Sequence, residues 1–107
     1  MELEPFKARL RRTARIVFSE HALLRAEERK IDLKEIEQNI RDPERLIHVR
    51  EEDERFTCWF AYSGSLGHRY TIHINADTLI ITVIKIRPRW QREVEKHAQK
   101  IPRRLRC

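Results

Sequence analysis

The dipeptide Asp42-Pro43 separates two kinds of hydrophobic pattern, and this change of pattern restricts the chain to a mixed α and β fold. Because the residue before a proline avoids helical backbone angles, a helix that precedes it ends there. Ahead of this point apolar residues recur at helical spacing, as Ile36 and Ile40 do. From Arg45 onward they alternate with polar residues, which is typical of strands with one buried face. The order predicts helices first and an antiparallel sheet afterwards.

Two short helices are predicted ahead of this boundary. Ser19 can cap a helix over residues 19–31, and Ala14–Phe18 before it has the pattern of a short strand. Asp32 begins a second helix, with Glu35 three residues later as in a capping box. Because the connection is short, we expect an αα-hairpin whose apolar sides need a sheet to cover them.

After the boundary, apolar alternation and turn residues predict four strands and a terminal helix. The strands are Leu46–Val49, Phe56–Tyr62, Arg69–Asn75 and Leu79–Ile86, with turns at 50–54, 63–67 and 76–77 and a helix at 91–100. The predicted fold class is α+β: a short N-terminal strand, an αα-hairpin on a four-stranded, mainly antiparallel sheet, and a C-terminal helix. Residues 1–12 are expected to be a basic flexible arm, 13–101 a single domain and 102–107 a basic tail.

The alternation also predicts which residues face one another across the strands. Every predicted pair is apolar or aromatic and lies on the buried face: Ile74–Leu79, Ile72–Ile81 and Tyr70–Val83 in the last hairpin, and Phe60–Tyr70, Cys58–Ile72 and Phe56–Ile74 in the hairpin before it. A register shifted by one residue would bring His73 and Arg69 into the core, which argues against such a shift.

Two groups of residues are candidates for a functional site. His21, Arg25 and Arg29 are spaced four apart and share one face of the first helix, where an imidazole base and two guanidinium groups could act on a phosphate. The opposite face of the sheet offers a rival pair of candidate catalytic residues, Arg69 and His73.

Further residues are candidates for binding nucleic acid. Trp59 could stack on a base, and positive charge on or near the same face comes from several side chains. The candidates are Arg29, Arg55, Trp59, Lys85 and Arg87. The alternative is that Trp59 packs against the C-terminal helix.

Composition favours an anionic partner. The chain has 23 basic against 17 acidic residues, and arginine, whose fork matches phosphate, supplies most of the positive charge. The chain contains no zinc-ligand spacing, P-loop or dinucleotide motif, so neither a metal nor a cofactor is expected. With no signal peptide and no apolar run near 18 residues, a cytoplasmic protein without membrane contact is predicted.

Several short motifs, taken in order, resemble those of a known group of proteins. They are His21, Arg25 and Arg29-Lys30-Ile31 in the first helix, Asp42-Pro43 after the second, then Gly67-His68-Arg69 and Ile80-Ile81-Thr82-Val83. Over residues 16–88 the chain resembles a family of uncharacterised small prokaryotic domains, related to the RelE/ParE-like toxin superfamily of small ribonucleases and gyrase poisons. Lys30 stands where that family usually has glycine, and Asp42 where it has asparagine.

The resemblance implies a RelE-like fold and a toxin-type endoribonuclease that needs no metal, in which the 2′-hydroxyl of RNA attacks the adjacent phosphate. It also implies a small acidic antitoxin as a partner. Two alternatives stay open: a nucleic-acid-binding module without catalysis, and an interaction protein such as a gyrase-poisoning toxin. The resemblance does not specify whether the RNA is bound on the ribosome or whether the chain forms oligomers.

Overall fold

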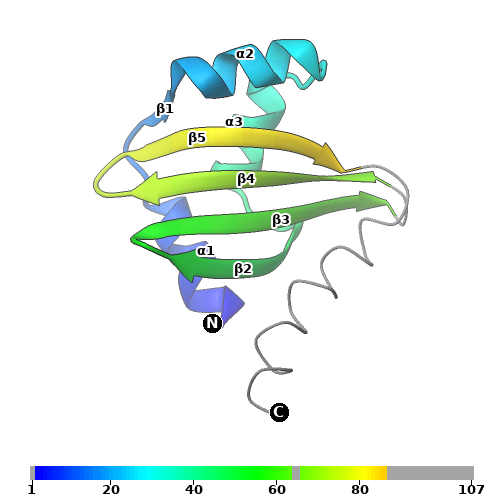
Figure 1. Cartoon of the computed structure of the whole chain (residues 1–107). Helices are drawn as coiled ribbons and strands as arrows, with labels where there is room; N and C mark the ends of the chain where they lie inside the picture. Colours follow the sequence, from blue (N-terminus) through cyan, green and yellow to red (C-terminus); the bar gives the residue numbers. More distant parts are fainter. Residues whose placement is uncertain (1, 64–65, 87–107) are drawn as a thin grey trace, which may run out of the picture.

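Five strands form one sheet in the order β1-β5-β4-β3-β2, and three helices cover one of its faces (Figure 1). A computed structural model describes residues 2–63 and 66–86 of the chain. The elements are α1 (Leu3–Arg11), β1 (Ile16–Phe18), α2 (Glu20–Glu28), α3 (Leu33–Arg41), β2 (Leu46–Glu52), β3 (Arg55–Ser63), β4 (Leu66–Ile74) and β5 (Thr78–Ile86). The fold is therefore α+β, as predicted.

Two parts of the layout differ from the prediction. The short strand β1 joins the edge of the sheet and runs parallel to β5, so the sheet is mixed and has five strands instead of four. The flexible arm predicted for residues 1–12 is wrong, because α1 occupies most of that stretch. The predicted C-terminal helix and the basic tail lie outside the described residues.

Helix α1 belongs to the hydrophobic core. Phe6 and Leu10, one helical turn apart, are both buried, and the Phe6 ring lies 4.9 Å from the ring of Phe56 in β3. Pro5 lies in the first turn of this helix. A proline is tolerated there because the first backbone N–H groups of a helix have no intrahelical partner.

The other two helices begin and end as their capping residues indicate. The Ser19 Oγ accepts a hydrogen bond from the N–H of Ala22, and the Asp32 Oδ1 accepts one from the N–H of Lys34, both at 3.0 Å. After α2, Lys30 adopts a φ of 56°, and the N–H of Ile31 donates to the carbonyl of Ala26. This is a Schellman-type ending with lysine at the left-handed position that favours glycine.

The charged run 50–54, predicted to be a turn, is mostly strand. β2 continues to Glu52, which pairs with Arg55, and only Asp53 and Glu54 form the turn. Both turn residues have positive φ angles of 52° and 64°. Two left-handed residues between paired strands form the type I′ turn that matches the twist of a hairpin.

The hairpin of β3 and β4 keeps the predicted faces, but its register differs by two residues. Phe56, Cys58 and Phe60 pair with Ile72, Tyr70 and His68, respectively. Since side chains alternate with a period of two, an even shift leaves the buried residues on the buried face. In the observed register His68 lies opposite Phe60 on the same buried face, where it is 1% exposed.

The register between β4 and β5 changes along the hairpin. Tyr70 pairs with Val83 as predicted, but Ile72 pairs with Ile80 and Ile74 with Thr78. The register changes between Thr71 and Ile72, where β5 has one residue more than β4. On the Tyr70 side of this irregularity the pairing follows the predicted register. Ile80, expected on the opposite face, therefore belongs to the core and is fully buried.

Candidate functional site

The predicted stripe on α2 lies at the surface of the helix and is only partly available for a ligand. His21 is exposed, two residues after the capping Ser19. The Arg25 guanidinium forms an ion pair of 2.9 Å with Glu28, and Nη1 of Arg29 points to the carbonyl of Val83 in β5 at 3.5 Å. Both arginines therefore have partners within the protein.

The rival candidates Arg69 and His73 lie on the other side of the sheet and do not form one site. They are four residues apart on β4, which separates them by about 13 Å along the strand. Arg69 lies over the ring of Trp59 and lines a cavity with it. His73 borders a different cavity that Arg9 also lines.

The other predicted binding residues are scattered. Trp59 is 1% exposed, so its ring is not accessible for stacking on a base in this structure. Arg55 is exposed beside the β2–β3 turn. Lys85 is the cross-strand partner of His68 and so lies on the helix-covered face. Arg87 lies outside the described residues.

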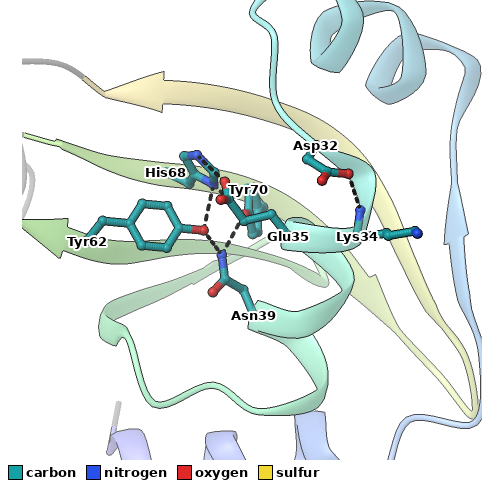
Figure 2. A network of polar contacts seen from close by, with 7 residues as sticks. All are labelled: Asp32, Lys34, Glu35, Asn39, Tyr62, His68 and Tyr70. Carbon is teal, nitrogen blue, oxygen red and sulfur yellow. Dashed lines mark hydrogen bonds and ion pairs between the residues drawn. The ribbon is translucent and has the colours of Figure 1, made fainter.

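A group of polar side chains that was not predicted from the sequence lies between α3 and the sheet (Figure 2). Glu35 and Asn39 come from adjacent turns of α3, Tyr62 from β3, and His68 and Tyr70 from β4. We call these five residues the Tyr–His network. Their side chains point toward one another in Figure 2, and hydrogen bonds or short polar contacts join all five.

The contacts of the Tyr–His network are short. Asn39 Nδ2 donates to the hydroxyl oxygens of Tyr62 and Tyr70 at 2.6 and 2.8 Å. His68 Nδ1 lies 2.7 Å from the Tyr70 hydroxyl and 3.3 Å from the Tyr62 hydroxyl. On the other side of the ring, His68 Nε2 lies 3.4 Å from Oε1 of Glu35. The imidazole thus separates a carboxylate from two phenols.

These contacts determine where the protons lie. Because His68 Nε2 faces a carboxylate, it carries the ring proton, and Nδ1 is left to accept. The Tyr70 hydroxyl donates to Nδ1 at the shorter distance, while its oxygen accepts from Asn39. Both hydrogens of the Asn39 amide are then used by the two phenols. The buried part of the network is satisfied with His68 neutral.

Burial keeps the histidine and the tyrosines uncharged. Desolvation, assisted by the charge of Lys85, lowers the pKa of His68 to about 4. Desolvation raises the pKa of Tyr62 and, more strongly, that of Tyr70. At neutral pH the network therefore contains a neutral imidazole and two protonated phenols, with the carboxylate of Glu35 at its outer end.

The outer end of the Tyr–His network is accessible and has basic neighbours. The Glu35 side chain is 47% exposed and Tyr62 is half-buried, whereas His68 and Tyr70 are buried. The Arg45 guanidinium lies 4.8 Å from the centre of the Tyr62 ring. A ligand could reach the carboxylate and the outer phenol but not the imidazole.

One sequence signal could have revealed this network. His68 lies two residues before Tyr70, so both side chains fall on the same face of a continuous strand. The predicted strand begins at Arg69 and so excludes His68, whereas β4 begins at Leu66. The approach of Glu35 to His68 depends on how α3 packs on the sheet and has no local signal.

Among the residues that the structure describes, no three His, Cys, Asp or Glu side chains gather in a way that could hold a metal ion. Within the same residues no helix has the length and apolar character needed to cross a membrane.

The fold and the Tyr–His network define a small α+β domain in which a buried imidazole lies beneath an exposed carboxylate. The chain belongs to the family described as a domain of unknown function, DUF4258, whose family model matches residues 18–85. The match includes α2 and all five residues of the Tyr–His network but excludes α1. No curated protein and no solved structure matches the chain significantly.

Proposed function

We propose that this protein is a metal-independent endoribonuclease with a RelE-like fold, acting as the toxin of a toxin–antitoxin pair. One observation carries the catalytic part: the Glu35 carboxylate and the Tyr62 hydroxyl lie on opposite sides of one buried imidazole, 3.4 and 3.3 Å from its two nitrogens. This arrangement holds an exposed base and a partly exposed acid at a defined separation, as cleavage of a phosphodiester requires.

The two outer groups fit the two proton transfers of RNA cleavage. Glu35 takes the proton of the 2′-hydroxyl as its oxygen attacks phosphorus, and Tyr62 gives its proton to the 5′-oxygen as the P–O bond breaks. The raised pKa of Tyr62 keeps this proton on the phenol at neutral pH. The products are a 2′,3′-cyclic phosphate and a 5′-hydroxyl, and water later returns the enzyme to its starting protonation state.

The remaining residues of the Tyr–His network position these groups. His68 is buried and so acts through its contacts with Glu35 and Tyr62 rather than on RNA. The N–H of Asn39 at 2.6 Å from the Tyr62 oxygen stabilises the phenolate that forms when the proton leaves. Removing a hydrogen bond of this kind affects the rate more than the binding of substrate.

RNA as the substrate is supported by charge. The net charge of +6 favours a polyanion, and cations lie beside the proposed catalytic pair. Arg45 lies over the Tyr62 ring, and Lys85 is close enough to His68 to affect its pKa. Both can offset the negative charge that develops on the phosphorane.

The decisive test compares single variants in an RNA cleavage assay with a chelator present. Glu35→Gln and Tyr62→Phe each remove one proton-transfer group with little change in shape, and we expect each to lower the cleavage rate about 100-fold or more. RNA binding should persist in both. His21→Ala and His73→Ala, which test the two sites predicted from the sequence, should retain activity.

Specific outcomes would contradict this assignment. Full cleavage by Glu35→Gln and Tyr62→Phe, with loss of cleavage in His21→Ala, would move the active site to α2. Absence of cleavage in the wild type, with RNA binding intact, would favour the binding module. DNA breaks in expressing cells, with RNA left intact, would favour a gyrase poison.

The toxin role is tested in cells. Expression of the wild-type chain should arrest growth, and Glu35→Gln should relieve the arrest at equal protein level. Co-expression of a small acidic protein from the neighbouring reading frame should also relieve it, because an antitoxin would cover the basic surface. Growth that is unaffected by the wild-type chain contradicts the toxin role but not the cleavage chemistry.

A further inference from the structure

The face of the sheet away from the helices carries an ordered row of polar side chains. Arg50 pairs with Thr57, Thr57 with Thr71, and Thr71 with Thr82, so these four residues form one row across β2, β3, β4 and β5. Cross-strand partners point to the same face and lie about 5 Å apart. The adjacent row contains Trp59, Arg69 and Ile84, which are paired in the same way.

A cavity of about 220 Å³ lies between these two rows. The described residues that line it are Arg50, Thr57, Trp59, Arg69, Thr71 and Ile84. Two guanidinium groups and two hydroxyl groups therefore surround a floor of indole and isoleucine. None of the described lining residues is acidic. We call this space the Arg50–Arg69 cavity.

The donors of the Arg50–Arg69 cavity fit the oxygens of a phosphate group. A guanidinium presents several N–H donors in one plane, and a threonine hydroxyl adds one more. Arg50 bonds Glu52 through Nη2 at 2.6 Å, but this carboxylate is 64% exposed. An exposed ion pair of this kind contributes little, so an anion can compete for Arg50.

The position of the Arg50–Arg69 cavity links it to the Tyr–His network. His68 and Arg69 are consecutive in β4, so their side chains point to opposite faces of the sheet. One strand thus contributes a residue to each site. Strand β3 likewise contributes Thr57 to the cavity and Tyr62 to the network, whereas β2 contributes only Arg50, to the cavity.

We propose that the Arg50–Arg69 cavity binds a phosphate group. Two sources share this chemistry, the backbone of single-stranded RNA and free phosphate. The RNA source rests on the proposed function and would give the enzyme a second contact with its substrate, behind the catalytic pair. The site itself requires only the residues of the cavity and does not depend on cleavage.

The test measures binding of a labelled 2′-O-methyl RNA, which cannot be cleaved, by fluorescence anisotropy with the full chain. Arg50→Met should weaken binding about tenfold, the loss typical of one charge-assisted hydrogen bond, and should lower the salt slope by about one. Arg55→Met removes the same charge from the same hairpin outside the cavity and should cost less than about threefold. Circular dichroism checks that each variant folds.

The threonines provide a second, shape-conserving test. Thr57→Val with Thr71→Val removes both hydroxyls of the cavity and should weaken RNA binding severalfold. Thr82 lies in the same row but is not among the described residues that line the cavity, so Thr82→Val should bind RNA as tightly as the wild type. Comparison of the double variant with Thr82→Val distinguishes a site with hydrogen-bond donors from a general electrostatic attraction.

Inorganic phosphate distinguishes the two sources. If phosphate shifts the side-chain NMR signals of Arg50 and Arg69 and displaces the RNA, the cavity holds an isolated phosphate. If RNA binding depends on Arg50 but resists competition by phosphate, the ligand is the RNA backbone. Equal losses in Arg50→Met and Arg55→Met, together with no shifts on adding phosphate, overturn the proposal.

Failure of this site and failure of the ribonuclease assignment give different results. Glu35→Gln should abolish cleavage and leave binding to the 2′-O-methyl RNA unchanged. A chain that binds RNA through Arg50 but cleaves none retains the phosphate site and loses the catalytic assignment. A different result would retain the catalytic assignment and rule out the phosphate site. In that case the chain cleaves RNA, Arg50→Met binds RNA as tightly as the wild type, and added phosphate shifts no NMR signal of Arg50 or Arg69.

Discussion

Acidification should destabilise this protein through His68. Burial and the charge of Lys85 lower the pKa of His68 from its ordinary 6.5 to about 4. The Glu35 carboxylate, 3.4 Å from Nε2, acts in the opposite direction because it favours the imidazolium ion. Glu35 is 47% exposed, so water screens its charge, and the effect of burial is the larger.

The sign and size follow from proton linkage. In the unfolded chain His68 takes up a proton near pH 6.5, whereas in the folded protein it does so only near pH 4. Stability therefore falls as the pH drops from 6.5 to 4 and changes little from this source above 6.5. At about 1.36 kcal/mol per pH unit, the difference corresponds to about 3 kcal/mol. Domains of this size are stable by about 5–15 kcal/mol, so the effect is large.

The assay is urea unfolding followed by circular dichroism, at several values between pH 7 and pH 4. The wild type is compared with His68→Gln, which has no titratable group at this position, and with His21→Gln, which alters an exposed histidine. Carboxylates titrate in all three proteins and largely cancel in the differences. The free-energy advantage of the wild type over His68→Gln should shrink by about 3 kcal/mol across this range.

Parallel pH profiles for the wild type and His68→Gln would refute this reasoning. They would show that His68 takes up its proton at the same pH in the folded and unfolded chains.

Three further predictions concern stability and reactivity. Lys30→Gly should raise the free energy of unfolding by up to about 1 kcal/mol in urea titrations, because the left-handed φ of 56° suits glycine; a loss of stability would contradict the Schellman ending. Phe6→Ala should cost about 3 kcal/mol or more in the same assay, since α1 packs its ring on Phe56, and a negligible loss would mean that α1 is dispensable. In a Cys107→Ser background, Cys58 should react with a thiol reagent only after unfolding, because burial raises the pKa of its thiol; rapid reaction of the native protein would disprove this.

Local signals in the sequence were sufficient to predict α2, α3 and the strands. Ser19 and Asp32 cap their helices as expected, because an N-cap acts on backbone groups only two or three residues away. Alternation assigned Cys58, Tyr70 and Ile72 to the buried face correctly, since a strand presents every second residue to the same side. The prediction of a flexible arm missed α1 because its many charged residues are typical of a solvated segment, and only the packing of Phe6 and Leu10 on the sheet shows that it belongs to the core.

The candidate sites were harder to predict. His21, Arg25 and Arg29 do share a helix, but two of them are engaged by Glu28 and by the carbonyl of Val83. Arg69 and His73 do share a strand face, but they line different cavities. The spacing of these residues in the sequence correctly predicted that each group shares one face of a helix or strand. It could not show which hydrogen-bond and ion-pair partners their side chains have in the folded protein.

The sequence by itself determined the order of helices and strands and the face on which most core residues lie, because caps, proline boundaries and alternation act over a few residues. Only the tertiary structure decided the registers and the meeting of α3 with the sheet. The strand β4 begins at Leu66 instead of Arg69, which includes His68 in the strand on the buried face, and the two-residue difference in register sets it opposite Phe60. The packing of α3 then brought Glu35 to one side of its ring and Asn39 to the phenols. These contacts span up to 33 residues, a range over which packing rather than local propensity determines position.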